Sequence, residues 1–107
     1  MKAMILRKTA PMETKPLEAV ELPMPVPAGR QLLIEVSACG ACHTDLDEIE
    51  GRLEAKLPIV PGHQVVARVV KKGENVQKFQ LGDRVGVTWL YSSCGKCAFC
   101  KSGEENL

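Results

Sequence analysis

Two short polar segments, Cys42-His43-Thr44-Asp45 and Gly62-His63-Gln64, constrain the fold of this 107-residue chain more than any other feature. They offer a thiolate and an imidazole, both common zinc ligands, from separate parts of the sequence. A zinc ion that acts in catalysis usually takes three protein ligands and leaves a fourth position for water or substrate. We therefore expect the fold to bring Cys42 and His63 together, with at least one further ligand from elsewhere.

Three cysteines near the end of the sequence form a second candidate metal site. Cys94, Cys97 and Cys100 are separated by two residues each, a spacing that lets three sulfurs converge on one tetrahedral ion. Zinc is favoured, because the bacterial iron–sulfur pattern with this spacing continues after three residues with Cys-Pro, whereas Lys101-Ser102-Gly103-Glu104 follows here. Iron–sulfur ligation and uncoordinated buried thiols remain the alternatives. No fourth cysteine follows, and the candidates for the fourth position are water, Glu104, Glu105 or a neighbouring chain.

The segment Cys39-Gly-Ala-Cys42 also has the spacing of a redox pair, which lowers the pKa of a thiol and permits a disulfide. No thioredoxin-like βαβ pattern surrounds it, and nearby histidines supply metal-site chemistry instead. We therefore favour metal binding and expect Cys39 to be a small buried side chain. A structural turn is the alternative for His63, which follows glycine.

The composition predicts a mainly β fold with an aliphatic core. Hydrophobic residues make up 45% of the chain but aromatic residues only 4%, so Val, Leu, Ile and Ala must fill the core. Turn signals between short β-branched runs indicate a small barrel or sandwich. In the second strand, Leu32, Ile34 and Val36 share one face of a period-two pattern, which predicts a half-buried strand. The predicted strands are residues 1–8, 31–37, 65–70 and 84–88.

One short helix is predicted at residues 43–50, where few helix breakers occur. Thr44 or a neighbouring Asp is expected to cap its start, and Gly51 to end it. The acidic side chains in and after this helix are expected to form a solvated face. Five prolines make residues 11–27 an irregular connector that cannot be helical. The acidic residues are Asp45, Asp47, Glu48, Glu50 and Glu54.

The charge balance gives no reason to expect nucleic acid or an anionic membrane as a partner. The chain has fourteen basic and thirteen acidic residues, so no strong net charge attracts a polyanion. No hydrophobic run approaches the roughly 18 residues of a membrane span, and the apolar part of residues 1–7 is too short for a signal peptide. A soluble cytoplasmic protein with one domain is the expectation.

Four motifs follow one another along the chain: Gly40-Ala41-Cys42-His43-Thr44-Asp45, Pro61-Gly62-His63, Gly82-Asp83-Arg84-Val85 and Cys94-Gly-Lys-Cys-Ala-Phe-Cys100. Together they resemble the zinc-dependent medium-chain alcohol dehydrogenases. The resemblance covers almost the whole chain. It implies a mainly β, GroES-like, partly open barrel with a short helix and a zinc-binding loop. Residues 1–107 would be the first part of that catalytic domain, without the Rossmann domain that binds NAD or NADP.

The resemblance also implies metal ligands. Cys42 and His63 would bind the catalytic zinc, and the third ligand of the family, another cysteine, would lie beyond Leu107. Asp45 would hydrogen-bond the imidazole of His63 and so fix its tautomer. Three of four ligands of a structural zinc would be Cys94, Cys97 and Cys100.

The remaining implied roles concern the reaction. Thr44 would accept the hydrogen bond of the substrate hydroxyl and pass its proton on, with His43 further along this relay or near the cofactor pyrophosphate. Trp89 would line the pocket and favour small primary alcohols. Gln64 departs from the glutamate common in the family and changes the charge near zinc. Alternatives remain: a helix N-terminal acid for Asp45, a cap for Thr44, solvent exposure for His43 and a core or surface aromatic for Trp89.

The resemblance finally implies an activity. The parent protein would oxidise alcohols to aldehydes or ketones with zinc, which acidifies the hydroxyl, and with NAD or NADP, which takes the hydride. No G-x-G-x-x-G dinucleotide motif occurs in the sequence, so the isolated chain is expected to be inactive. A non-catalytic zinc-binding GroES-like module and a thiol redox protein using Cys39 and Cys42 are the alternatives. The alcohol, the choice of cofactor and the formation of a homo-oligomer are left open.

Overall fold

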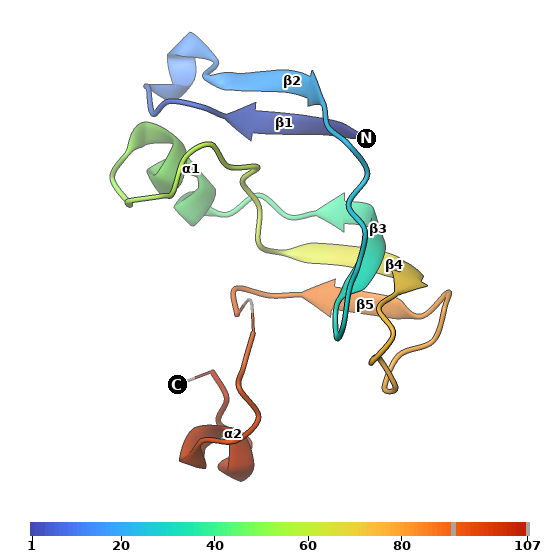
Figure 1. The fold of residues 1–107 in the computed structure, drawn as a ribbon. Helices are drawn as coiled ribbons and strands as arrows, with labels where there is room; N and C mark the ends of the chain where they lie inside the picture. Colours follow the sequence, from blue (N-terminus) through green and yellow to red (C-terminus); the bar gives the residue numbers. More distant parts are fainter. Residues whose placement is uncertain (91, 107) are drawn as a thin grey trace.

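Two antiparallel sheets form the framework of the chain in the computed structural model, which describes residues 1–90 and 92–106. The first sheet pairs β1 (Lys2–Leu6) with β2 (Leu17–Glu21). The second has the order β3-β4-β5, formed by Leu32–Cys39, Val65–Lys72 and Arg84–Val87. Figure 1 shows α1 (His43–Glu50) near the first sheet and α2 (Ala98–Ser102) projecting away from both sheets.

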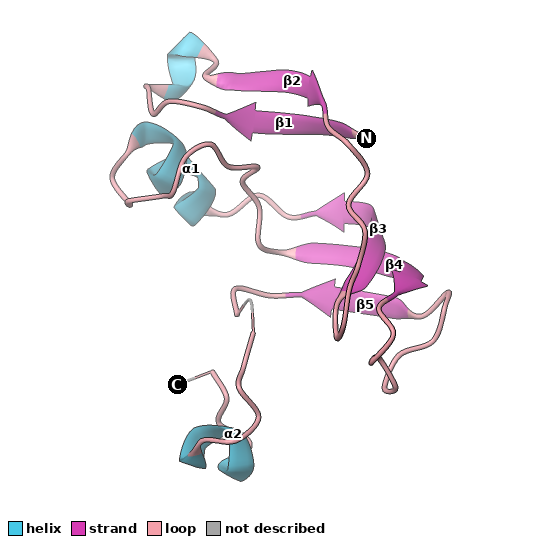
Figure 2. Cartoon of the chain, in the orientation of Figure 1, coloured by secondary structure: helices cyan, strands magenta, loops and turns pink. Residues whose placement is uncertain are grey.

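The prediction of a mainly β fold is confirmed, since the regular structure consists mostly of strands, with two short helices and one 3-10 turn among the described residues (Figure 2). Among residues 1–90 and 92–106 the strands form two open sheets rather than a closed barrel. In the same part of the chain, neither helix has the length and apolar character needed to cross a lipid bilayer.

The core is small and aliphatic, as the composition predicts. Its buried members come from both sheets and from α1, and Leu6 is completely buried. Leu6 also exchanges two backbone hydrogen bonds with Ile59, at 2.7 and 3.0 Å. This bridge fixes the segment that leads to His63 against β1. The buried hydrophobic residues are Ile5, Leu6, Ile49, Ala67 and Val69.

The prediction that residues 11–27 form only an irregular connector is wrong. Residues 12–14 form a single 3-10 turn, η1 (Met12–Thr14), and residues 17–21 form strand β2. The five residues of β2 lie between Pro16 and Pro23 and contain no proline, so all of their backbone N–H groups are available. The prolines therefore bound the strand and do not prevent it.

The period-two prediction for β3 is only partly correct. Leu32 and Ile34 are half-buried as predicted, but Val36 is 57% exposed. The pairing with β4 shifts register between Leu33 and Ile34 and again between Val36 and Ala38. The first shift leaves Val70 of β4 unpaired and the second leaves Ser37 of β3 unpaired. Such bulges bend and twist a strand locally, which a strict alternation does not anticipate.

Helix α1 has the predicted bounds, but its N-cap is Cys42 rather than Thr44 or an aspartate. The carboxylate of Asp45, three residues later, accepts the backbone N–H of Cys42 at 2.8 Å. This is the reciprocal half of a capping box, in which the side chain at the third helical position satisfies a free donor at the cap. Gly51 ends the helix with a left-handed φ of 79°, as predicted.

Replacement of Leu6 by Ala tests the bridge between β1 and the segment before His63. Removing this fully buried side chain should lower the free energy of unfolding by about 3 kcal/mol, the usual cost of a buried leucine truncation. Met4→Ala, in the same strand but 46% exposed, is the control and should cost less than about 0.5 kcal/mol. Chemical denaturation measures both, and equal effects would contradict this description of the core.

Candidate metal centre

One end of the three-stranded sheet assembles the candidate site. Cys42 follows the end of β3, His63 precedes the start of β4, and Trp89 follows the end of β5. Because β4 is antiparallel to both neighbours, these three positions meet at the same edge, where Cys39 pairs with Val65 and Val65 with Val87. Strand register therefore brings together residues that are far apart in the sequence.

Two glycines allow the close approach of the segments at this edge. Gly40 donates its N–H to the carbonyl of Gln64 at 2.8 Å, and a Cβ at Gly40 would lie 2.9 Å from Gln64 Oε1. Gly62 has a φ of 124°, and a Cβ there would lie 2.8 Å from Cys39 Sγ. A side chain at Gly62 would meet both steric and conformational strain next to His63.

The thiol of Cys42 and the imidazole of His63 lie close enough for each to shift the pKa of the other. Hydrogen bonds from the backbone and hydroxyl of Thr44, and then from His63, lower the pKa of the Cys42 thiol. The same contact with Cys42 is the main cause that raises the pKa of His63, and the Asp45 carboxylate adds to it. A thiolate and an imidazole thus lie side by side, the donor pair that zinc binds in proteins.

Asp45 lies behind His63, where the resemblance expects it. His63 Nδ1 is 3.2 Å from Asp45 Oδ1, and the two side chains are only 17% and 15% exposed. Asp45 Oδ1 is buried and forms no hydrogen bond among the described residues, so its contact with His63 is an ion-pair contact. With Nδ1 facing this carboxylate, the His63 ring has Nε2 available as a ligand atom.

Trp89 stacks edge-on against His63, with ring centroids 4.8 Å apart and an interplanar angle of 71°. Both rings line a hollow of about 190 Å³, together with Glu48 and an apolar wall. Trp89 therefore lies at the wall of a hollow, the position that its predicted pocket role requires, although the residue is 62% exposed. The wall residues are Ile59, Val60, Pro61 and Gly62.

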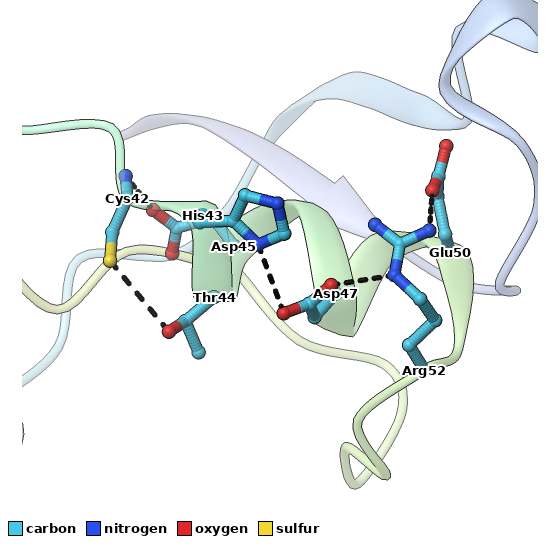
Figure 3. Close-up of polar contacts among 7 residues, drawn as sticks. All are labelled: Cys42, His43, Thr44, Asp45, Asp47, Glu50 and Arg52. Carbon is cyan, nitrogen blue, oxygen red and sulfur yellow. Dashed lines mark hydrogen bonds and ion pairs between the residues drawn. The ribbon is translucent and has the colours of Figure 1, made fainter.

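Thr44 and His43 occupy the first turn of α1 and differ in their surroundings. The hydroxyl of Thr44 lies 3.7 Å from Cys42 Sγ, next to the candidate ligands. The side chain of His43 is 78% exposed, and its Nδ1 lies 3.1 Å from Asp47 Oδ2. Figure 3 shows these contacts along the helix.

The prediction of a solvated acidic face on α1 is wrong, because most of its carboxylates have partners. Asp45 contacts Cys42 and His63, and Asp47 contacts His43 and Arg52. Glu50 contacts Arg52 as well and accepts the backbone N–H of Met12 at 3.1 Å. Arg52 is the main cause that lowers the pKa of Asp47, whereas the Met12 N–H is the main cause for Glu50.

Two residues of this region have contacts that the sequence does not indicate. Arg52 lies just past the helix end and binds two carboxylates of α1, Asp47 and Glu50, a role that its spacing of five and two residues from them makes possible. Glu48 faces the hollow beside His63, which a charge pattern alone does not reveal.

Cys39 is exposed rather than buried, which corrects the prediction. It lies at the end of β3 beside Gly62 and contacts the carbonyl of Gly40 at 3.8 Å. All five cysteines are free thiols.

The three C-terminal cysteines converge as predicted. Their sulfurs lie within 4.8 Å of one another, and Cys94 Sγ is 3.8 Å from Cys100 Sγ. Backbone N–H groups of Lys96 and Cys97 point at Cys94 Sγ at 3.4 and 3.3 Å, and these contacts lower the pKa of this thiol to about 7. A contact with Cys97 is the main cause that raises the pKa of Cys100. The turn thus presents three sulfurs to one ion.

Comparison with known proteins identifies relatives of this chain. Residues 28–107 match the family described as the alcohol dehydrogenase GroES-like domain. The chain is 44% identical to the probable alcohol dehydrogenase AdhA of Mycobacterium tuberculosis, over 100% of this chain and 33% of that protein. It is 43% identical to an alcohol dehydrogenase of Geobacillus stearothermophilus, over 87% of this chain and 28% of that protein.

Solved structures of alcohol dehydrogenases are also similar to this chain. The cobalt- and zinc-bound thermostable alcohol dehydrogenase from Pyrobaculum aerophilum superposes with a TM-score of 0.87 at 27% identity, covering 100% of this chain and 32% of that one. The chain therefore spans about a third of the length of the proteins it matches.

Alkylation of the metal-free chain tests the cysteine turn. Because N–H donors stabilise the Cys94 thiolate, its reaction with iodoacetamide should rise with a midpoint near pH 7, where about half of the thiol is ionised. Cys100 should need a higher pH, since its pKa is raised. Peptide mass spectrometry measures both rates, and faster reaction of Cys100 at pH 7 would contradict the described contacts.

Proposed function

This chain belongs to the zinc-dependent medium-chain alcohol dehydrogenases, whose GroES-like domain it carries, and on that premise we propose that Cys42 and His63 hold the catalytic zinc of an alcohol dehydrogenase. The reaction interconverts alcohols and aldehydes or ketones with NAD or NADP. The observation that carries the proposal is the placement of Asp45 against both candidate ligands: its carboxylate accepts the backbone N–H of Cys42 at 2.8 Å and lies 3.2 Å from His63 Nδ1.

The residues at this edge fit a zinc ion. Thiolate and imidazole are its preferred ligands, and the buried Asp45 oxygen near His63 Nδ1 matches the carboxylate that usually supports a zinc-bound histidine. A zinc ion bound there supplies Lewis acidity that makes an alcohol hydroxyl easier to ionise. Further ligands come from outside the Cys42 and His63 segments.

The other residues of the site bind substrate and move its proton. Thr44, whose hydroxyl lies beside Cys42 Sγ, accepts the proton of the substrate hydroxyl and passes it outward along α1 towards exposed His43. Trp89 and the apolar wall of the hollow exclude water from the carbon end of the substrate. The hollow of about 190 Å³ is smaller than the pockets of drug-sized ligands and suits a small alcohol or aldehyde.

The cysteine turn is proposed as a structural zinc site. Cys94, Cys97 and Cys100 would hold an ion that stiffens the segment around α2, which projects away from the sheets (Figure 1). Zinc suits this sulfur set best, in keeping with the zinc named for the Pyrobaculum relative.

The alternatives have less support. A thiol redox protein would need a Cys39–Cys42 pair, yet Cys42 is engaged with Thr44 and His63. A non-catalytic zinc module would not need the hollow beside His63 or the pairing of Asp45 with this ring.

Replacing Cys42 tests the proposed function in a chimera. The 107-residue chain would take the place of the matching segment in the Geobacillus relative, which supplies the rest of the enzyme. Cys42→Ala should lower alcohol turnover by about a thousandfold or more, because Lewis-acid stabilisation of the transition state is worth several kcal/mol. Initial rates of NAD or NADP reduction measure the effect.

Cys39→Ala is the matched control in the same chimera and should change turnover by less than about twofold, a small change in activation free energy. Unchanged turnover in Cys42→Ala would refute the proposal. An equal loss in both variants would favour the redox alternative.

Asp45→Asn tests the support of His63. Loss of the carboxylate charge behind the ring should raise the zinc concentration that restores activity after chelation by about tenfold to a hundredfold. Glu54→Gln removes a similar charge from an exposed position and should leave this concentration unchanged. Equal zinc requirements in Asp45→Asn and the unchanged chimera would remove Asp45 from the site.

A further inference from the structure

We propose that Glu48 is a specificity-determining residue that favours small alcohols carrying a positive charge, such as amino alcohols, over uncharged alcohols of the same size. The hydroxyl end of such a substrate would lie at Cys42 and His63, so this inference rests on the proposed function. Recognition of the charged end depends on the hollow beside His63 and needs no zinc.

Glu48 places a carboxylate at the wall of the candidate substrate site. It lies four residues after Thr44 on α1, and residues at this spacing share one face of a helix. On that face, the Thr44 hydroxyl lies 3.7 Å from Cys42 Sγ. Glu48 is half-buried and lines the hollow of about 190 Å³ together with His63. The carboxylate is therefore on the side of the helix that a substrate would contact.

This carboxylate has no cationic partner of its own. Arg52 lies four residues after Glu48, the spacing at which an ion pair ordinarily forms on a helix. However, α1 ends at Gly51, and the guanidinium binds Asp47 and Glu50 instead (Figure 3). Within residues 1–90 and 92–106, no ion pair or hydrogen bond reaches the side chain of Glu48. Its charge is therefore left to act on a molecule in the hollow.

The other walls of the hollow suit a short chain that ends in a cation. Trp89 lines the same space, and tryptophan is the aromatic side chain that attracts cations most strongly. Ile59, Val60 and Pro61 provide an apolar wall for methylene groups. Small-molecule sites in proteins are mostly apolar, with a few polar groups that fix the orientation of the ligand. Glu48 is the anionic group of this set.

The carboxylate is also separate from the candidate metal ligands. In the described part of the chain, Glu48 forms no converging set of three ligand atoms with Cys42 and His63, in contrast to the three C-terminal cysteines. A cation held by Glu48 would thus be at some distance from the zinc, which weakens the repulsion between the two positive charges.

Binding to the 107-residue chain tests the inference without any turnover. Trp89 is the one tryptophan of the sequence, so its fluorescence reports on the hollow. The probes are propanolamine with its amine and hydroxyl at opposite ends, propanediol with a hydroxyl at each end, and n-butanol. All three have the same number of non-hydrogen atoms and differ at one end.

At pH 7 the amine of propanolamine is protonated, because the pKa of such an amine lies near the lysine value of about 10.4. Its dissociation constant should be about fivefold lower than those of propanediol and n-butanol, the effect of one partly exposed ion pair. Equal dissociation constants for the three probes would overturn the inference. Equal preference for propanolamine and propanediol over n-butanol would overturn it as well, since hydrogen bonding rather than charge would then select the ligand.

Glu48→Gln removes the charge and keeps the shape of the side chain, so the preference for propanolamine should disappear. Glu54→Gln is the matched control, because it removes an exposed carboxylate of the following segment, and it should keep the preference. A preference that survives in Glu48→Gln would overturn the inference.

Salt provides a test that needs no variant, should circular dichroism show that Glu48→Gln does not fold. Raising the ionic strength from about 0.01 M to about 1 M shortens the screening length from about 30 Å to about 3 Å. The preference of the unchanged chain for propanolamine should then fall towards one, whereas the binding of n-butanol should not weaken. A preference that is indifferent to salt would overturn the inference.

Kinetics of the Geobacillus chimera separate this inference from the proposed function. In an active chimera, Glu48→Gln should lower the ratio of kcat/KM for propanolamine to that for n-butanol about fivefold, through KM, and leave the zinc content unchanged. An equal loss for both substrates, or a loss of zinc, would assign Glu48 to the metal centre and overturn the inference. An inactive unsubstituted chimera together with the preference seen by fluorescence would instead refute the proposed function and leave the recognition of a cation by Glu48 standing.

Discussion

The antiparallel register of β4 against β3 and β5 is the constraint on which the site depends. It sets the end of β3, the start of β4 and the end of β5 at one edge, so that Cys42, His63 and Trp89 meet. Because side chains alternate along a strand, a slip of one residue would turn every side chain of β4 to the other face and take Ala67 and Val69 out of the core. The same aliphatic burial that stabilises the sheet therefore fixes the distance between thiol and imidazole.

Helix α1 adds the electrostatic order of the site. It begins at Cys42, and its acidic residues divide between an inner pair with His63 and an outer pair with His43. Arg52, one residue beyond the C-cap, holds the outer carboxylates in place. Asp45, Asp47 and Glu50, which would otherwise repel one another on a short helix, thus each have a partner. The two histidines have distinct surroundings, since one ring is mostly buried and the other is open to solvent.

Much of this arrangement follows from the sequence, and the failures have physical reasons. The Cys-x-x-Cys-x-x-Cys pattern predicts the converging sulfurs, because this spacing lets three thiols reach one ion. The shared site of Cys42 and His63 stays a prediction, which the mutual effect of these two side chains on their pKa values supports. Strand β2 is not predicted, because the prolines of residues 11–27 indicate an irregular segment although they only bound the strand. The bulges in β3, the exposure of Cys39 and the pairs formed by Arg52 arise from long-range packing, which neither periodicity nor charge patterns contain.

Proton–proton distances around the His63 ring test the account most directly. In a nuclear Overhauser spectrum of the chain, the ring protons of His63 should give cross-peaks to the β protons of Cys42 and to the indole of Trp89, three side chains from three different strand ends. A His63 ring that contacts neither of them would show that the sheet edge does not assemble the thiolate and imidazole pair, and the assignment of a catalytic zinc centre to this chain would then be wrong.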